Sequence, residues 1–183
     1  MSTILFEKHD YLAKLGKEAS IREAKEEDFI SIWKIFRKVV GEGEYTSTVR
    51  LDTSRDRYED TDEANDMKKF ITVLCEVEKQ IVGYATVEEP IWELSSHAGE
   101  LGIAVLPQFR GVGIGSALLD SALEVALQKG FKKVNLSVFS TNKTAMNLYK
   151  KFGFKKVGKK KKQFYLHGKY IDEIIMEKFI API

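Results

Sequence analysis

The feature that most constrains this chain is a glycine-rich turn that follows an apolar strand and precedes an amphipathic helix. The stretch from Gly99 to Gly115 reads GELGIAVLPQFRGVGIG, and its first half has the β-branched content of a buried strand. Pro107 ends regular pairing because proline has no N–H to donate. From Ser116 apolar residues recur at helical spacing. This order directs several backbone N–H groups and a helix N-terminus at one point, which suits an anion such as a phosphate.

Length and charge indicate a single globular domain in residues 19–183, preceded by an arm or short helix in residues 1–18. The 183 residues suffice for one sizeable core. The 29 basic and 27 acidic residues leave a net charge of +2, too small to predict a nucleic-acid or membrane partner. No apolar run reaches the roughly 18–20 residues of a membrane span. Acidic residues stand where a signal peptide is apolar, so we expect a cytoplasmic protein.

Hydrophobic periodicity predicts alternating strands and helices. We expect strands near residues 21–24, 70–77, 81–87, 100–106, 133–139, 154–157 and 170–179, and helices over 26–40, about 52–70, 116–129 and a short segment after Asn142. The lysine run 159–162 falls in the predicted connection between the last two strands, where we interpret it as a solvated turn rather than a nucleic-acid surface. Cys75, the only cysteine, lies in a predicted strand, so we expect an inert buried thiol.

Two common phosphate-binding designs do not fit the turn. A P-loop needs a Lys-Ser/Thr pair after its last glycine, but Gly115 is followed by Ser116 and Ala117. A dinucleotide-binding fingerprint needs G-x-G-x-x-G and an acidic residue after the next strand, but the glycines stand at 111, 113 and 115, and residues 133–140 contain no acid. The turn therefore belongs to another kind of phosphate site.

Two motifs together identify that kind of site. The run from Arg110 to Gly115 matches R-x-x-G-x-G, and the run from Asn142 to Phe154 matches N-x-x-A-x-x-L-Y-x-K-x-G-F. With both motifs the chain resembles the GNAT superfamily of N-acetyltransferases, and the segment His167–Asp172 and the Glu100 strand look most like phosphinothricin-type and related small-amine acetyltransferases. The resemblance implies a mixed α/β fold with a central, mostly antiparallel sheet of about seven strands flanked by helices.

The resemblance also implies acetyl-CoA as cosubstrate. In the family the glycine turn binds the pyrophosphate, here through the backbone of Arg110, Gly111, Val112, Gly113, Ile114, Gly115 and Ser116. The side chain of Arg110 is expected to add positive charge; the alternative is that it points to solvent. The pantetheine arm is expected along Ile103, Ala104 and Val105, where the family's sheet opens at a bulge, with further contacts from Asn142, Ala145 and Tyr149. Asn142 also stands where a helix N-cap belongs. No metal site is expected, because His9 and His167 lack neighbours at ligand spacing.

The resemblance and elementary chemistry suggest two catalytic residues. Tyr149 is the candidate general acid, because a phenol is protonated at neutral pH and can donate to the departing thiolate; the alternative is an aromatic residue packed in the core. Glu100 is the candidate general base for the attacking amine, with strand alternation placing it beside Gly102 and Ala104; the alternative is a solvated glutamate. His97 is a second candidate base, and Glu88 and Glu89 are weaker ones. No covalent enzyme intermediate is needed.

The amine acceptor is left open by the sequence. The acidic stretch 42–66 favours a small cationic molecule such as a polyamine, an amino acid or an aminoglycoside; as an alternative, the stretch is simply a solvated helix face. A protein N-terminus or a lysine is the alternative acceptor, and a non-catalytic acyl-CoA-binding module is the alternative function. Dimers are common in the family, so a homodimer is an expected assembly.

Overall fold

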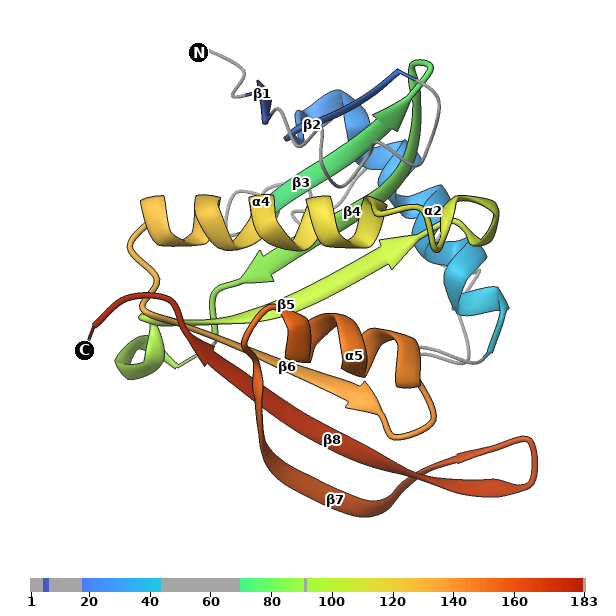
Figure 1. Ribbon diagram of the computed structural model, residues 1–183, viewed down its shortest axis with the longest axis vertical. Helices are drawn as coiled ribbons and strands as arrows, with labels where there is room; N and C mark the ends of the chain where they lie inside the picture. The colour runs from blue at the N-terminus through green and yellow to red at the C-terminus, as the bar shows by residue number, and fades with distance from the viewer. Residues whose placement is uncertain (1–4, 7–17, 44–69, 91, 183) are drawn as a thin grey trace.

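The structure, a computed structural model, describes residues 5–6, 18–43, 70–90 and 92–182. Its strands are β1 (Leu5–Phe6), β2 (Ala19–Glu23), β3 (Phe70–Val77), β4 (Gln80–Glu88), β5 (Ala98–Val105), β6 (Lys133–Phe139), β7 (Lys155–Leu166) and β8 (Lys169–Phe179). They form one eight-stranded sheet in the order β1-β2-β3-β4-β5-β6-β8-β7 (Figure 1). The β5–β6 pair is parallel and the other pairs are antiparallel. The expected mixed α/β class is confirmed, with β1 as an additional strand.

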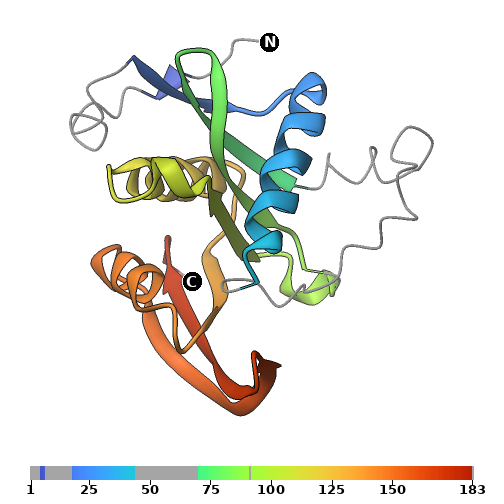
Figure 2. The same ribbon diagram turned by 90° about the vertical axis from the view of Figure 1, so that its right-hand side faces the viewer.

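Helices cover both faces of this sheet. The helices are α2 (Phe29–Gly41), α4 (Ile114–Gln128) and α5 (Lys143–Lys151), with short 3-10 segments η2 (Glu26–Asp28), η5 (Glu93–Ser95) and η6 (Pro107–Phe109). Figure 2 shows α2 on one side of the sheet and α4 and α5 on the other. None of the helices in the described residues is long and apolar enough to cross a membrane.

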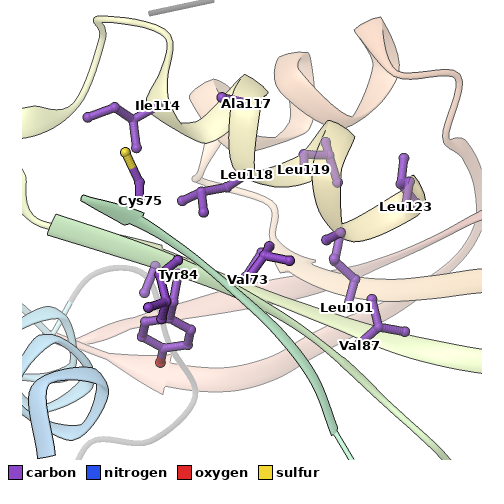
Figure 3. Packing of buried hydrophobic residues seen from close by; sticks show 14 of the residues in the cluster. Val73, Cys75, Tyr84, Val87, Leu101, Ile114, Ala117, Leu118, Leu119 and Leu123 are labelled. Atoms are coloured by element: carbon purple, nitrogen blue, oxygen red, sulfur yellow. The ribbon is translucent and has the colours of Figure 1, made fainter. Parts of the chain in front are cut away.

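The main core lies between α4 and the central strands. Leu118 and Leu119 of α4 are fully buried, and Leu118 points toward the central strands (Figure 3). Cys75 lies in this layer with no exposed surface, and burial raises the pKa of its thiol to about 12, so the expectation of a buried thiol is confirmed. Tyr84 points to the opposite side of the sheet, toward α2. Both faces of the central strands are therefore packed.

A charged cluster fixes the start of α2 against the sheet. The guanidinium of Arg22 on β2 donates from Nη1 and Nη2 to the two carboxylate oxygens of Asp28, at 2.6 and 2.8 Å. It also donates from Nε and Nη2 to Glu76 on β3, at 3.1 and 3.0 Å. The Arg22 and Asp28 side chains are only 12% and 7% exposed, so these bonds are shielded from water.

The final hairpin differs from the prediction. Lys159–Lys162 lie inside β7, whereas the sequence analysis placed them in the turn. The actual turn is His167–Gly168, whose φ values of +48° and +76° are left-handed and suit a two-residue hairpin connection. The strand accommodates these lysines because Lys159 and Lys160 form ion pairs with Asp172 and Glu173 on the neighbouring strand β8.

Several other predictions are changed at their edges or lie outside the described residues. The β3–β4 turn is the two residues Glu78 and Lys79, since Gln80 already pairs with Val77. The predicted helix over 52–70 is outside the described residues except for Phe70, which begins β3. Of the predicted arm 1–18, the structure describes the strand β1, which pairs with β2, and Glu18.

Candidate active site

The glycine turn has the geometry of an anion cradle. Gly111 and Gly113 have φ values of +78° and +101°, a region that residues with a side chain rarely occupy. A Cβ atom built on Gly111 would meet nothing within 4 Å, so the space in front of the turn is open. Gly113 is the N-cap of α4, and helix geometry leaves the N–H groups of Ile114 and Gly115 without partners inside the helix. The turn therefore fits a phosphate group.

Two backbone N–H groups predicted to belong to this cradle already have acceptors in the protein, and that of Arg110 donates to the Pro107 carbonyl at 3.2 Å. The N–H of Ser116 donates to the Gly113 carbonyl at 2.9 Å. The side chain of Arg110 donates from Nε to the Val105 carbonyl at 2.8 Å, and from Nη1 and Nη2 to the two carboxylate oxygens of Glu42 at 2.7 and 2.8 Å. Glu42 is the described end of the acidic stretch 42–66, and its charge is compensated by Arg110; residues 44–66 lie outside the described residues.

The sheet opens next to the turn. β5 pairs with β6 at only three positions, Ala98↔Lys133, Gly99↔Val134 and Glu100↔Asn135. Beyond Glu100, β5 continues to Val105 beside β4, whereas β6 continues to Phe139 beside β8. At Ile103, Ala104 and Val105, the edge of β5 that faces β6 is therefore not paired with it. The β4–β5 register runs from Glu88 to Gly83 without a shift, so no bulge in that pairing produces the opening.

The second motif lies against the first. Asn142 caps α5, since its Oδ1 accepts a hydrogen bond from the N–H of Ala145 at 3.0 Å, which confirms its predicted position as N-cap. A Cβ atom built on Gly115 would lie 3.5 Å from Cδ2 of Leu148, so α5 touches the first turn of α4. Tyr149, the next residue, is 6% exposed. The chain therefore brings the two motifs into contact on one face of the sheet (Figure 2).

Tyr149 has the protonation state that a general acid needs. Burial raises the pKa of its phenol above its ordinary value near 10, so the hydroxyl keeps its proton at neutral pH. Its ring also contacts Phe154, with ring centroids 5.8 Å apart. The packing role and the acid role that the sequence suggested are therefore compatible in this geometry.

Glu100 stands at the point where the opening begins, opposite Glu88 of β4 and Asn135 of β6. Its side chain is accessible, yet the surrounding strands desolvate it enough to raise its pKa. The carboxylates of Glu88 and Glu173 raise that pKa further, while Lys160 opposes them. A carboxylate with a raised pKa is a stronger base, which suits proton transfer from an amine.

The neighbours Glu173 and Lys160 were missed by the sequence analysis because the β7–β8 register is not visible in it. Lys160 Nζ lies 2.8 Å from Oε2 of Glu173 and forms an ion pair with it. Burial acts to raise the pKa of Glu173, but Lys160 and Ser137 outweigh it and hold that pKa below its usual range. Among the carboxylates of Glu88, Glu100 and Glu173, that of Glu173 is thus the one whose negative charge is compensated by Lys160.

The remaining candidate bases, His97 and Glu89, lie outside strands β5 and β4. His97 precedes β5 and is exposed, and its carbonyl accepts hydrogen bonds from the N–H groups of Lys132 and Lys133. Glu89 is exposed beyond the end of β4. On the Glu100 face of β5, Ala104 is buried opposite Tyr84, and a Cβ atom on the exposed Gly102 would lie 2.8 Å from Oγ1 of Thr86, so the free space predicted above these two residues is not found. No group of residues that could hold a metal ion occurs in the described parts of the chain.

Comparisons with known proteins give the chain a family. A model described as the acetyltransferase (GNAT) family matches residues 21–154. The chain is 30% identical to the L-amino acid N-acetyltransferase AaaT of Escherichia coli (strain K12) over 107 residues, which are 58% of this chain and 65% of AaaT, less than two thirds of it. It is 32% identical to an N-alpha-acetyltransferase of Sulfurisphaera tokodaii over 166 residues, 85% of this chain and 91% of that protein.

A solved structure agrees at the level of the fold. A GNAT superfamily phosphinothricin acetyltransferase from Sinorhizobium meliloti, in complex with acetyl-CoA, superposes with a TM-score of 0.79 and 23% sequence identity, covering 89% of each chain. The family model covers most of the chain, and the Sulfurisphaera relative is matched over nearly its whole length. This chain belongs to the acetyltransferase (GNAT) family.

Proposed function

We propose that this protein is an N-acetyltransferase that transfers the acetyl group of acetyl-CoA directly to a primary amine of a small cationic molecule. One observation carries the proposal: the open glycine turn follows the strand β5 that diverges from β6, and the first turn of α4 contacts α5, the helix that carries Tyr149, with Glu100 at the closed end of the divergence.

The donor fits the residues that line this region. The pyrophosphate would accept hydrogen bonds from the N–H groups at the start of α4, where the helix dipole also favours negative charge. The pantetheine arm would lie along Ile103, Ala104 and Val105, occupying the side of β5 from which β6 has separated. An N–H of that strand would polarise the thioester carbonyl. The acetyl-CoA complex of the Sinorhizobium relative supports this donor.

Proton transfer completes the proposed reaction. The ammonium group of the acceptor loses one proton to Glu100, and the neutral nitrogen then attacks the thioester carbonyl carbon. The new C–N bond forms, the C–S bond breaks, and the departing thiolate takes a proton from Tyr149. The nitrogen loses its second proton as the amide forms, and that proton returns to the Tyr149 phenolate, so that the one proton released overall is the one taken by Glu100. Glu100 precedes Ile103 by three residues, about 10 Å along a strand, so its proton is relayed through water.

The charge around the opening supports a cationic acceptor. Glu173 is compensated by Lys160, whereas Glu88 and Glu100 lie opposite each other across β4 and β5. Burial raises the pKa of both, and the carboxylate of Glu88 raises that of Glu100 further. A cation close to both would relieve their mutual repulsion. Amino acids, polyamines and aminoglycosides satisfy this requirement, and AaaT is named for L-amino acids.

A second candidate acceptor is a protein N-terminus. The Sulfurisphaera relative, which matches 85% of this chain, is named an N-alpha-acetyltransferase. A peptide α-amino group is also cationic at neutral pH, with an ordinary pKa near 8. A protein lysine would meet the same carboxylates with a higher pKa.

An acceptor screen tests the proposal. The purified chain would be given acetyl-CoA and separate panels of polyamines, amino acids, aminoglycosides and N-terminal peptides, with release of free thiol as the readout. We expect turnover with a small cationic amine that exceeds turnover with peptides. Turnover with peptides alone would establish the second candidate. Tight acetyl-CoA binding without turnover on any panel would instead show a binding module and refute the enzymatic proposal.

A further inference from the structure

We propose that Arg110 is a positioning residue for the glycine turn rather than a ligand of the pyrophosphate, and that Glu42 at the end of α2 is its partner in this role. The inference rests on the proposed donor site at that turn. It concerns two residues that are 68 positions apart in the chain, so no local pattern in the sequence connects them.

The contacts of Arg110 direct its charge away from a phosphate. Each of its three guanidinium nitrogens donates to a protein oxygen, two to the carboxylate of Glu42 and one to the carbonyl of Val105. The side chains of Arg110 and Glu42 are 34% and 22% exposed, so the pair is partly shielded from solvent. The positive charge of a guanidinium that is bound bidentately by a carboxylate is largely compensated, so its attraction for a second anion is weak.

The same contacts hold the residue at which the turn begins. Val105 ends β5, and Arg110 directly precedes Gly111, the first residue of the turn with a left-handed φ. Glu42 is itself fixed, since its N–H donates to the carbonyls of Val39 and Val40 at the end of α2. Arg110 therefore ties the start of the turn to the last residue of β5 on one side and to the end of α2 on the other.

This arrangement predicts that Glu42 controls coenzyme A affinity without touching coenzyme A. If the pair orders the turn, Glu42→Gln and Arg110→Met each release the same constraint, and the double variant loses no more than either single variant. Arg110→Lys distinguishes a cation that binds phosphate from one that positions the turn. A lysine can serve a phosphate as a point charge, but it cannot make the forked contact to Glu42 together with the bond to Val105.

The test is calorimetric titration of the full chain with coenzyme A. We expect Glu42→Gln, Arg110→Met, Arg110→Lys and the double variant all to bind roughly tenfold more weakly, equivalent to about 1.4 kcal/mol. The KM for acetyl-CoA should rise by a similar factor, while kcat at saturating acetyl-CoA stays near that of the unmodified protein. A general loss of folding would lower kcat instead. Because Arg110→Lys keeps the charge and the aliphatic stem, it remains informative if another variant fails to fold.

Glu177→Gln is the matched control. Glu177 on β8 is paired with Lys133 at 2.5 Å and its side chain is 24% exposed, close to the exposure of Glu42, but the pair involves β6 and β8 rather than the turn. We expect this variant to keep the coenzyme A affinity of the unmodified protein.

Three results would overturn the inference: unchanged or tighter binding by Glu42→Gln, full affinity in Arg110→Lys, or a roughly hundredfold loss in the double variant, which would indicate independent contributions. If the unmodified protein itself failed to bind coenzyme A, the donor site would be refuted instead. The two failures are therefore distinguishable.

Discussion

The sharpest test of the donor site compares two glycines at opposite ends of α4. Gly111 precedes the helix with φ +78°, and Gly130 follows it with φ +94°. A Cβ atom on either would meet nothing within 4 Å, so an alanine at each position introduces backbone strain and no clash. The left-handed region costs a residue with a side chain about 1–2 kcal/mol. For a chain of this size that corresponds to a decrease of about 2–8 °C in Tm for both variants.

Coenzyme A affinity should separate the two variants. In Gly111→Ala, relief of the strain shifts the turn, and the new methyl group occupies the space in which we place the pyrophosphate. Loss of one charge-assisted hydrogen bond is worth about 1.5–3 kcal/mol, so we expect binding to weaken roughly 10- to 100-fold. Gly130→Ala should bind as the unmodified protein does. Thermal unfolding and calorimetric titration measure the two quantities. Equal affinities in the presence of equal decreases in Tm would refute the assignment of the pyrophosphate to this turn.

Three further predictions concern the chemistry and the fold. Glu100→Gln should lower kcat/KM by about 10²- to 10⁴-fold. It should also abolish the rise of rate as pH increases through the raised pKa of Glu100; an unchanged pH–rate profile would argue against its role as base. Tyr149→Phe should lower kcat and change coenzyme A affinity by less than about twofold, since the hydroxyl is proposed to act on the departing thiolate; a large loss of affinity would assign Tyr149 to binding or packing. Asp28→Asn should destabilise the protein by about 2–4 kcal/mol in denaturant unfolding, because it leaves the shielded Arg22 with Glu76 alone. The exposed control Glu27→Gln should change stability by less than about 0.5 kcal/mol.

The carboxylate of Asp28 makes the folding stability depend on pH. Hydrogen bonds from Arg22 hold the pKa of Asp28 below its usual value, although burial opposes them, and the Lys25 N–H lowers it further. A carboxyl whose pKa is lower in the folded state contributes stability that is complete above its unfolded pKa, near 4, and is lost as pH falls through the folded pKa. Asp28→Asn should therefore differ most from the unmodified protein at neutral pH and least in strong acid.

Features set by local chemistry were predictable from the sequence. The sequence predicts the strand 133–139 with the bounds that the structure shows, because apolar and polar residues alternate between a helix-ending Gly130 and a polar turn. Asn142 was recognised as a cap because an asparagine before an apolar helix supplies the missing acceptor for an N–H of the first turn.

Features set by pairing were not predictable. The surroundings of Glu100 depend on the register that brings Glu88, Glu173 and Lys160 beside it, and one residue of slip would turn each side chain to the other face. The lysines of β7 resembled a turn because lysine has low strand propensity, and only the acids opposite them reconcile them with a strand. The link between Arg110 and Glu42 likewise exists only once α2 is packed on the sheet.

The separation of β5 from β6 has a consequence for the protein's survival in a cell. A parallel pair that is joined at three positions and then parts leaves a seam in the middle of the sheet, and a molecule that forms hydrogen bonds along Ile103–Val105 would close it. Such a molecule binds only the folded chain, so its concentration adds to folding stability, by about 2.7 kcal/mol at one hundred times its Kd. Resistance to heat and proteolysis would then increase with the concentration of acetyl-CoA, so the lifetime of the protein would depend on the concentration of its substrate.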